Sequence, residues 1–256
     1  MKFKVLCLHG YTQSAQKFRD RTGPFRRALK ATITTTFLDA PHQATHIFTP
    51  TNGTVNTTNN ASKDDAKNNE EEESSLAWWN QGEDSDRVWQ EIRASIRAVA
   101  QVIRDEGPFD GIVGFSQGAG MAAILCALAQ LASIAKNSSN PSLVLEEMSE
   151  DVRAAVVDLG LSQGFGFGLF FAGFYPGMPQ FTEIMQRAGK LELRSMHVMG
   201  EADAIVSPER GAELAHKAFC RAVTAYHPGG HFMPSNAEWR KQYQEFFLTL
   251  TQKQQE

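Results

Sequence analysis

The most informative stretch of the sequence is Gly111-Ile112-Val113-Gly114-Phe115-Ser116-Gln117-Gly118-Ala119-Gly120-Met121-Ala122-Ala123. Within it, Gly114, Ser116 and Gly118 have the spacing G-x-S-x-G, which is typical of a serine held on a sharp turn between a strand and a helix. Glycine is needed on both sides of the serine because this turn brings the two backbones close together. The apolar residues before the turn predict the strand, and the small residues after it predict a closely packed helix. The alternative is a glycine-rich turn with a solvated serine.

Short apolar runs alternate with longer helical patterns along the chain. The strand-like runs are Phe3–Leu8, Ile33–Asp39, Gly111–Phe115, Gly168–Phe174, Arg194–Met199 and Ala222–His227. The helical patterns are Ala15–Lys30, Val88–Ile103, Gln117–Ile134, Leu143–Leu159, Ser207–Cys220 and Ala237–Leu250. This alternation favours an α/β fold with a mainly parallel sheet of about six strands and helices on both faces. We expect one domain over residues 1–256.

A catalytic serine at the glycine turn would need two further residues downstream. A hydroxyl is a poor nucleophile near neutral pH, so a base must take its proton and an acid must orient that base. His231 follows the last predicted strand on a glycine loop and is the predicted base, whereas His227 at the strand end is predicted to be structural. Asp203, on the loop after the preceding strand, is the predicted acid, with Glu201 as the alternative. The order Ser116, Asp203, His231 is that of the α/β hydrolases.

The same chemistry requires hydrogen-bond donors for the negative charge that develops on a carbonyl oxygen. One predicted donor is the backbone N–H of Gln117, immediately after the serine. The other is predicted in the loop after the first strand, where Gly10 permits an unusual turn and the N–H of Tyr11 follows. His9 is predicted to make a structural hydrogen bond, because a second base is not needed.

The overall charge excludes several classes of partner. The 256 residues include 25 Lys and Arg against 29 Asp and Glu, a net charge of −4. Without a run of five basic residues, the chain has no electrostatic signature of a nucleic-acid or anionic membrane partner. The longest apolar stretches, Met121–Leu131 and Phe165–Phe174, are shorter than the roughly 20 residues that cross a bilayer. We therefore expect a small-molecule substrate, and the sequence carries no signal for an oligomeric state.

The cysteines and the first residues indicate a cytoplasmic location. Cys7, Cys126 and Cys220 are an odd number, and they are scattered, which disfavours a disulfide framework. The apolar run that begins at Val5 is too short for a signal peptide and lacks a small-residue cleavage site. We expect the chain to work in a reducing compartment.

Residues Thr49–Ser75 differ in composition from the rest of the chain. Thr, Asn and Ser dominate, and six acidic residues stand against two lysines, so this segment carries a net charge of −4. Such a composition buries too little apolar surface to order itself. We expect a disordered, solvated insertion in an otherwise neutral domain.

Two histidine pairs have the H-x-x-x-H spacing that can bind a metal ion on a helix. They are His42 with His46 and His227 with His231. Neither pair includes the glutamate of a zinc protease, and proline or glycine disfavours a helix at both. The chain also has no G-x-G-x-x-G or phosphate-binding loop. We predict no metal and no other cofactor.

The motifs together resemble one known family, the fungal family of serine hydrolases (FSH type). This is a small α/β-hydrolase group with an animal tumour-associated relative. The resemblance covers residues 3–248 and rests on Leu8–Gln13, Asp39-Ala40-Pro41, Trp78-Trp79, Gly107–Gly118, Gly200 with Asp203, and His227–His231. It implies that Ser116 is the nucleophile, Asp203 the orienting acid and His231 the base, in agreement with the independent interpretation of the residues.

The resemblance also implies hydrolysis of carboxylic esters. Some relatives in fungal secondary-metabolite clusters act instead as thioesterases or release polyketide chains, so a thioester substrate is the alternative hypothesis. A third hypothesis is a non-catalytic protein that binds a ligand in the same cleft, for which a damaged set of catalytic residues would be the signature. This chain departs from the usual pattern at Thr49–Ser75 and at Phe165–Phe174.

Aromatic residues supply candidate walls for an acyl pocket, because acyl chains bind to apolar surfaces. Trp78, Trp79 and Phe174 are the predicted substrate-binding residues. Further candidates are Phe165, Phe167, Phe170, Phe171 and Tyr175.

Overall fold

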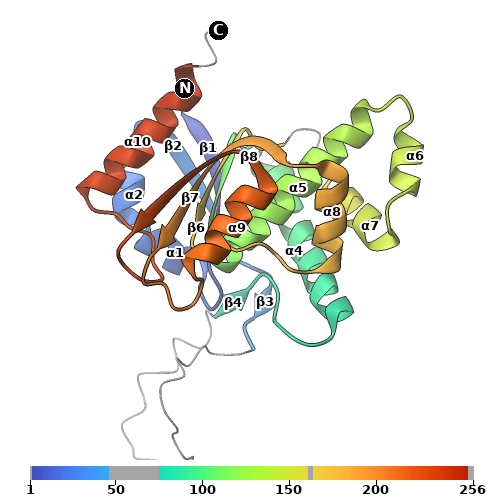
Figure 1. Cartoon of the computed structure of the whole chain (residues 1–256), viewed down its shortest axis with the longest axis horizontal. Helices are drawn as coiled ribbons and strands as arrows, with labels where there is room; N and C mark the ends of the chain where they lie inside the picture. Colours follow the sequence, from blue (N-terminus) through green and yellow to red (C-terminus); the bar gives the residue numbers. More distant parts are fainter. Residues whose placement is uncertain (1, 46–74, 161–163, 253–256) are drawn as a thin grey trace, which may run out of the picture.

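A six-stranded parallel sheet forms the centre of the computed structural model, which describes residues 2–45, 75–160 and 164–252 (Figure 1). Its strands are β1 (Phe3–Leu8), β2 (Ile33–Leu38), β5 (Gly111–Phe115), β6 (Phe167–Phe171), β7 (Leu191–Gly200) and β8 (Phe219–His227). Their order is β2-β1-β5-β6-β7-β8, so the chain changes direction across the sheet between β1 and β5. Ligands of such sheets bind beyond the carboxyl ends of the strands at this switch point. The predicted α/β fold is confirmed.

Helices cover both faces of the sheet (Figure 1). One face is covered by α1 (Ala15–Arg21), α2 (Gly23–Ala28) and α10 (Ala237–Gln252). The other is covered by α4 (Ser85–Glu106), α5 (Gln117–Asn137), α6 (Pro141–Glu146), α7 (Glu150–Leu159), α8 (Pro179–Ala188) and α9 (Pro208–Ala218). Buried side chains form a separate apolar cluster on each face. The sheet therefore lies between two cores, and the loops at its ends are free to carry other chemistry.

The central helix α5 is apolar on almost every side. It packs against β5, α7 and α8, and its composition and length would also suit a membrane span. Its most apolar 18-residue window is 78% buried within the molecule. A helix enclosed by its own protein has no need of a polar face. Its place in the core thus accounts for its composition.

Two predicted helices are each divided in two. The predicted helix Ala15–Lys30 breaks at Thr22, because Pro24 cannot donate the backbone hydrogen bond that a continuous helix needs there. Leu143–Leu159 breaks before Ser149, whose hydroxyl accepts from the N–H of Val152 and so begins α7 as its N-cap. Both breaks occur at residues that typically start a new helix.

Several predicted boundaries are wrong. The strand predicted as Gly168–Phe174 is β6, which ends at Phe171, and the helix predicted to end at Cys220 stops at Ala218. The chain passes from α9 to β8 without a loop, so Cys220 belongs to the strand. Helix α8 is not among the predicted helices, although its buried residues have helical spacing. Of the acidic segment Thr49–Ser75, residues 49–74 lie outside the described residues.

A second, two-stranded sheet was also not predicted. Its strands β3 (His42–Gln43) and β4 (Leu76–Ala77) pair antiparallel and lie beside the loop that follows β1 (Figure 1). Thr12 N–H donates to Leu76 O at 2.9 Å, and Leu76 N–H donates to Gln13 O at 3.0 Å. Residues far apart in the sequence thereby hold the loop after β1 in place.

Candidate active site

Ser116 occupies the sharp turn that joins β5 to α5. Its backbone has φ 53° and ψ −119°, a conformation that costs free energy for a residue with a side chain. A Cβ at Gly114 would lie 2.4 Å from Gly118 O, and one at Gly118 would lie 2.3 Å from the carbonyl oxygens of Leu8 and His9. No such contact is tolerated, so both glycines are required by the close approach of strand, helix and neighbouring loop. The strand, turn and helix predicted from the sequence are all present.

Asp203 and His231 come together from the loops that follow β7 and β8. His231 Nδ1 donates to Asp203 Oδ2 across 2.7 Å. The other carboxylate oxygen, Oδ1, accepts from the N–H groups of Ile205 and Val206, both at 2.9 Å. The Asp203 side chain has no exposed surface, whereas 15% of the His231 side chain is exposed. With its proton on Nδ1, neutral His231 has a lone pair on Nε2 that can accept a proton from another group.

Backbone hydrogen bonds join these two loops. Glu201 N–H donates to His227 O at 2.8 Å and Ala202 N–H donates to Gly229 O at 3.1 Å. A Cβ at Gly200 would lie 2.5 Å from the carbonyl oxygens of Gly229 and Gly230. The loops can therefore approach only because residue 200 is glycine. Glu201, the alternative acid, is exposed at the surface of this junction.

His227 supports the loop that carries His231. Its Nδ1 accepts from Gly229 N–H at 3.2 Å, and its ring packs against Phe232 and Trp239. Burial lowers the pKa of His227, although the carboxylate of Asp203 partly offsets this effect. This neutral, packed ring has the structural role that the sequence predicted for it.

The loop after β1 lies directly against the serine turn. A Cβ at Gly10 would be 2.9 Å from the Phe115 ring and 3.4 Å from Ser116 Cβ, and Tyr11 is the next residue of this loop. His9 is completely buried, with its Nδ1 2.8 Å from Gly10 O and its Nε2 accepting from Ala40 N–H at 3.0 Å. Burial lowers the pKa of His9, so a neutral ring holds the loop.

Gln117 has a structural role that the sequence did not reveal. Its side-chain oxygen accepts from Trp78 N–H at 2.9 Å, and its side-chain nitrogen donates to Trp79 O at 2.6 Å. Its backbone N–H belongs to the first turn of α5, where the N–H groups have no partner within the helix. These contacts join residues 38 and 39 positions apart, and no local motif signals such a pairing.

The predicted aromatic residues have different positions. Trp78 has no exposed surface and donates its indole N–H to His9 O at 2.8 Å, so it fixes the loop after β1 instead of facing a substrate. Trp79 and Phe174 contact each other edge to face and pack over Gly120 in the first turn of α5. Phe174 is half-buried. Trp79 and Phe174 thus lie next to the serine turn.

The other aromatic candidates lie in or near the core. Phe167, Phe170 and Phe171 are buried within β6, and Phe165 lines a cavity at the opposite end of the sheet. Tyr175 is half-buried and contacts Phe181 of α8 edge to face. The aromatic character of this segment is therefore explained mainly by packing.

A pocket of about 280 Å³ adjoins His231 on the face covered by α1, α2 and α10. We name it the His231 pocket. Its polar lining residues are Gln13, Arg21, Thr22 and His231, and its apolar ones are Phe18, Phe115, Phe232 and Met233. The ring centroids of Phe115 and His231 are 4.9 Å apart. Of this set, the sequence predicted a role in the site only for His231, because the others come from three separate segments of the chain.

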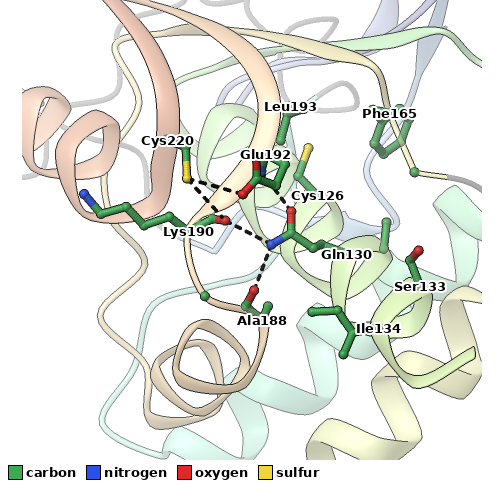
Figure 2. Close-up of a pocket in the computed structure, with 13 residues that line it drawn as sticks. Cys126, Gln130, Ser133, Ile134, Phe165, Ala188, Lys190, Glu192, Leu193 and Cys220 are labelled. Carbon is green, nitrogen blue, oxygen red and sulfur yellow. Dashed lines mark hydrogen bonds between the residues drawn. The ribbon is translucent and has the colours of Figure 1, made fainter. Parts of the chain in front are cut away.

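A larger cavity, of about 560 Å³, lies at the amino ends of β7 and β8 (Figure 2). Figure 2 shows Gln130 at its centre, donating to the carbonyls of Ala188 and Lys190 and accepting from Glu192 N–H. Burial raises the pKa of the Cys126 thiol beside it, so this thiol is not a ready nucleophile. None of the predicted catalytic residues lines this cavity.

The sequence predicts no metal site at either of the two histidine pairs with the H-x-x-x-H spacing. His42 Nε2 lies 2.9 Å from Glu91 O, and His46 is outside the described residues. His227 and His231 each use Nδ1 in a hydrogen bond of the site. Among residues 2–45, 75–160 and 164–252, no group of three or more potential ligands gathers.

Comparison with known proteins identifies the family. A family model described as "Serine hydrolase (FSH1)" matches residues 1–243. The chain belongs to this family. The resemblance seen in its motifs is thereby confirmed.

Relatives of this serine hydrolase are found among animal proteins. The chain is 32% identical over 252 residues to "Esterase OVCA2" of Homo sapiens, covering 95% of this chain and 94% of that protein. It is 30% identical to the protein of the same name from Danio rerio, covering 95% of both. Among solved structures, Arabidopsis thaliana SOBER1 superposes with a TM-score of 0.56 at 15% identity, over 97% of this chain and 99% of that one. This last likeness supports the fold alone.

Proposed function

We propose that this serine hydrolase is a carboxylic ester hydrolase with Ser116 as nucleophile, His231 as general base and Asp203 as orienting acid. The observation that carries the proposal is the hydrogen bond between the buried Asp203 carboxylate and His231 Nδ1. It lies at the end of the sheet where Ser116 occupies a strained turn. A buried, fully bonded acid fixes the imidazole so that Nε2 can take a proton. The names of the animal relatives support an ester substrate.

The reaction starts when Ser116 Oγ attacks the carbonyl carbon of the ester and its proton passes to His231 Nε2. The negative charge that develops on the carbonyl oxygen is stabilised by the N–H groups of Gln117 and Tyr11. The tetrahedral intermediate then collapses to an acyl-enzyme, and His231 returns the proton to the leaving alcohol. Water, activated by the same histidine, hydrolyses the acyl-enzyme. Asp203 stays charged throughout and stabilises the imidazolium.

Trp79 and Phe174 are the proposed contacts of the acyl chain. They pack over the first turn of α5, beside Ser116, and Phe174 retains exposed surface. Arg210 lies 4.9 Å above the Phe174 ring, which holds the ring in its present orientation. An apolar chain that displaced water from these rings would gain hydrophobic free energy.

The test is the rate of hydrolysis of 4-nitrophenyl esters and matched thioesters of increasing acyl length, with Ser116→Ala measured beside the wild type. We expect turnover of oxygen esters with an optimum at one chain length, and its loss in the variant. Turnover confined to thioesters would replace the ester by a thioester as substrate. No turnover of either series, or full turnover by Ser116→Ala, would contradict the proposed mechanism.

A further inference from the structure

The His231 pocket has the position of a subsite for one half of the substrate. Because the base that deprotonates the serine must later protonate the leaving atom, the leaving group has to lie beside the free nitrogen of His231. The Trp79 and Phe174 pair belongs to the apolar cluster on one face of the sheet, whereas Phe18 and Phe115 of the pocket belong to the cluster on the other. The two faces therefore offer separate apolar surfaces, one for each half of an ester.

The volume of the pocket suits a small group. At roughly 30 Å³ for each water-sized group, a cavity of about 280 Å³ holds about nine of them. This is the size of a substituted phenol or a short alcohol with one polar end group. The rings of Phe18 and Phe115 provide apolar walls for the body of such a group.

Two residues of the polar lining, Gln13 and Arg21, offer unused hydrogen-bond donors. None of the eight lining residues is acidic. Within the described part of the chain, no hydrogen bond is made by Gln13 Nε2, and Arg21 forms neither a hydrogen bond nor an ion pair. The Thr22 hydroxyl is already used, since it donates to Phe18 O at 2.8 Å. An unpaired amide N–H₂ and an unpaired guanidinium both favour an acceptor with negative charge.

The two helices nearest the pocket in the sequence, α1 and α2, carry charge of the same sign. Residues 15–30, which form α1 and α2, contain six basic residues and one acidic residue, a net charge of +5 in a chain whose total is −4. None of the six forms an ion pair among the residues that the structure describes. Uncompensated charge of one sign raises the local concentration of ligands of the opposite sign.

We propose that the His231 pocket binds an anionic leaving group, an alcohol, phenol or thiol that carries a carboxylate or a phosphate, and that Arg21 recognises its charge. This inference rests on the proposed function, because only a catalytic His231 requires the leaving group to enter here. Arg21 then determines the specificity of the enzyme for the leaving group of the ester and not for its acyl chain.

The helix end offers a matched control. Arg19 and Arg21 both lie in the last turn of α1, where a positive side chain interacts favourably with the helix dipole. Only Arg21 lines the pocket. Substitution of either arginine by glutamine removes the same helix-end interaction, so a difference between Arg19→Gln and Arg21→Gln reports on the pocket.

The experiment compares butyryl esters of 4-hydroxybenzoate and 4-hydroxybenzamide, which differ in the charge of the leaving group and hardly in its size. At low salt we expect the wild type and Arg19→Gln to prefer the benzoate ester about fivefold in kcat/KM, a modest factor because Arg21 is exposed. In Arg21→Gln we expect this ratio of kcat/KM values to fall to about one, mainly through a change in KM. In the wild type we expect the ratio to decrease as the salt concentration rises. The ester of 4-hydroxyphenylphosphonate ranks phosphate-like groups against carboxylate.

Two results would overturn the inference. One is an equal rate of the wild type on the charged and neutral esters, and the other is a preference that survives in Arg21→Gln. Either result leaves the proposed function intact as long as Ser116→Ala abolishes hydrolysis of the neutral ester. Hydrolysis of the neutral ester by Ser116→Ala would instead contradict the proposed function itself.

Discussion

The two ends of the sheet differ in what their cavities contain. At the amino ends of β7 and β8, the larger cavity is lined by groups that satisfy one another, as Gln130 does with the backbone of Ala188, Lys190 and Glu192. At the carboxyl ends, a smaller pocket adjoins His231, whose partner is the buried Asp203 carboxylate, and the strained turn of Ser116 lies at the same end. The proposed active site is therefore marked by strain and buried charge, and the larger cavity lies elsewhere.

Removal of the base should have the largest effect. We expect His231→Ala to lower kcat for an ester by about 10⁴- to 10⁶-fold, because the serine then loses the group that accepts its proton. The matched change at the other end of the sheet, Gln130→Ala, should leave kcat within a factor of about two, since none of the proposed catalytic residues lies there. Steady-state kinetics measure both. Comparable losses in the two variants would remove the distinction between the two ends.

Removal of the negative charge of the acid should have the next largest effect. Asp203→Asn should lower kcat about 10⁴-fold by favouring the wrong tautomer of His231. The side-chain oxygen of the introduced asparagine can still accept from the N–H groups of Ile205 and Val206, so the melting temperature should change little. Glu201→Gln, at the exposed alternative acid, should retain activity. Kinetics and thermal unfolding of both variants test this, and a larger loss in Glu201→Gln would reverse the assignment of the acid.

The glycines at the two ends should tolerate a methyl group differently. Gly118→Ala places a Cβ 2.3 Å from the backbone oxygens of Leu8 and His9, which cannot move aside, and should lower the free energy of unfolding by about 3 kcal/mol or prevent folding. Gly164→Ala, beside the larger cavity, meets only Ala129 Cβ at 3.6 Å and should be nearly neutral. Denaturant unfolding measures the difference, and equal effects would show that the close packing at the serine turn is not needed.

A buried histidine between the two ends should make the fold sensitive to acid. His197 in β7 stacks on Phe170, and burial lowers its pKa from 6.5 to about 3. The unfolded chain binds a proton at this residue near pH 6.5 whereas the folded protein does not, so protonation stabilises the unfolded state as the pH falls. Between about pH 6.5 and 5 this should cost about 1–2 kcal/mol of stability.

The control for this effect is His197→Gln, which cannot titrate in this range. Between about pH 6.5 and 5, the free energy of unfolding of this variant should fall by about 1–2 kcal/mol less than that of the wild type. Urea unfolding at a series of pH values gives both slopes. Parallel slopes would mean that His197 is not the source of the acid sensitivity.

Sequence patterns predicted the parts of the molecule that local physics determines. The strand at Gly111–Phe115, the helix after it and the loops that carry Asp203 and His231 follow from apolar runs, glycines and chain order. The breaks at Thr22 and before Ser149 were also visible in the sequence, as a proline and a capping serine. The apolar periodicity continues across both breaks, and periodicity alone therefore predicts one helix at each place.

Other features depend on contacts between distant segments. The pair β3 and β4 has only two residues in each strand, too few for a periodic pattern. The hydrogen bonds of Gln117 with the backbone of Trp78 and Trp79 exist only once α5 and the loop after β4 have met. That Arg21 lines the same pocket as His231 likewise follows from tertiary packing. No single-sequence pattern encodes such pairings.

The most direct test of the account is to trap the nucleophile with a fluorophosphonate, which reacts with an activated serine, and to locate the adduct by mass spectrometry of the intact protein and its peptides. We predict one adduct per chain, on Ser116, formed at the rate at which esterase activity is lost and absent in Ser116→Ala and strongly slowed in His231→Ala. An adduct on another residue, or full activity after Ser116 has been modified, would contradict the assignment of Ser116 as the nucleophile.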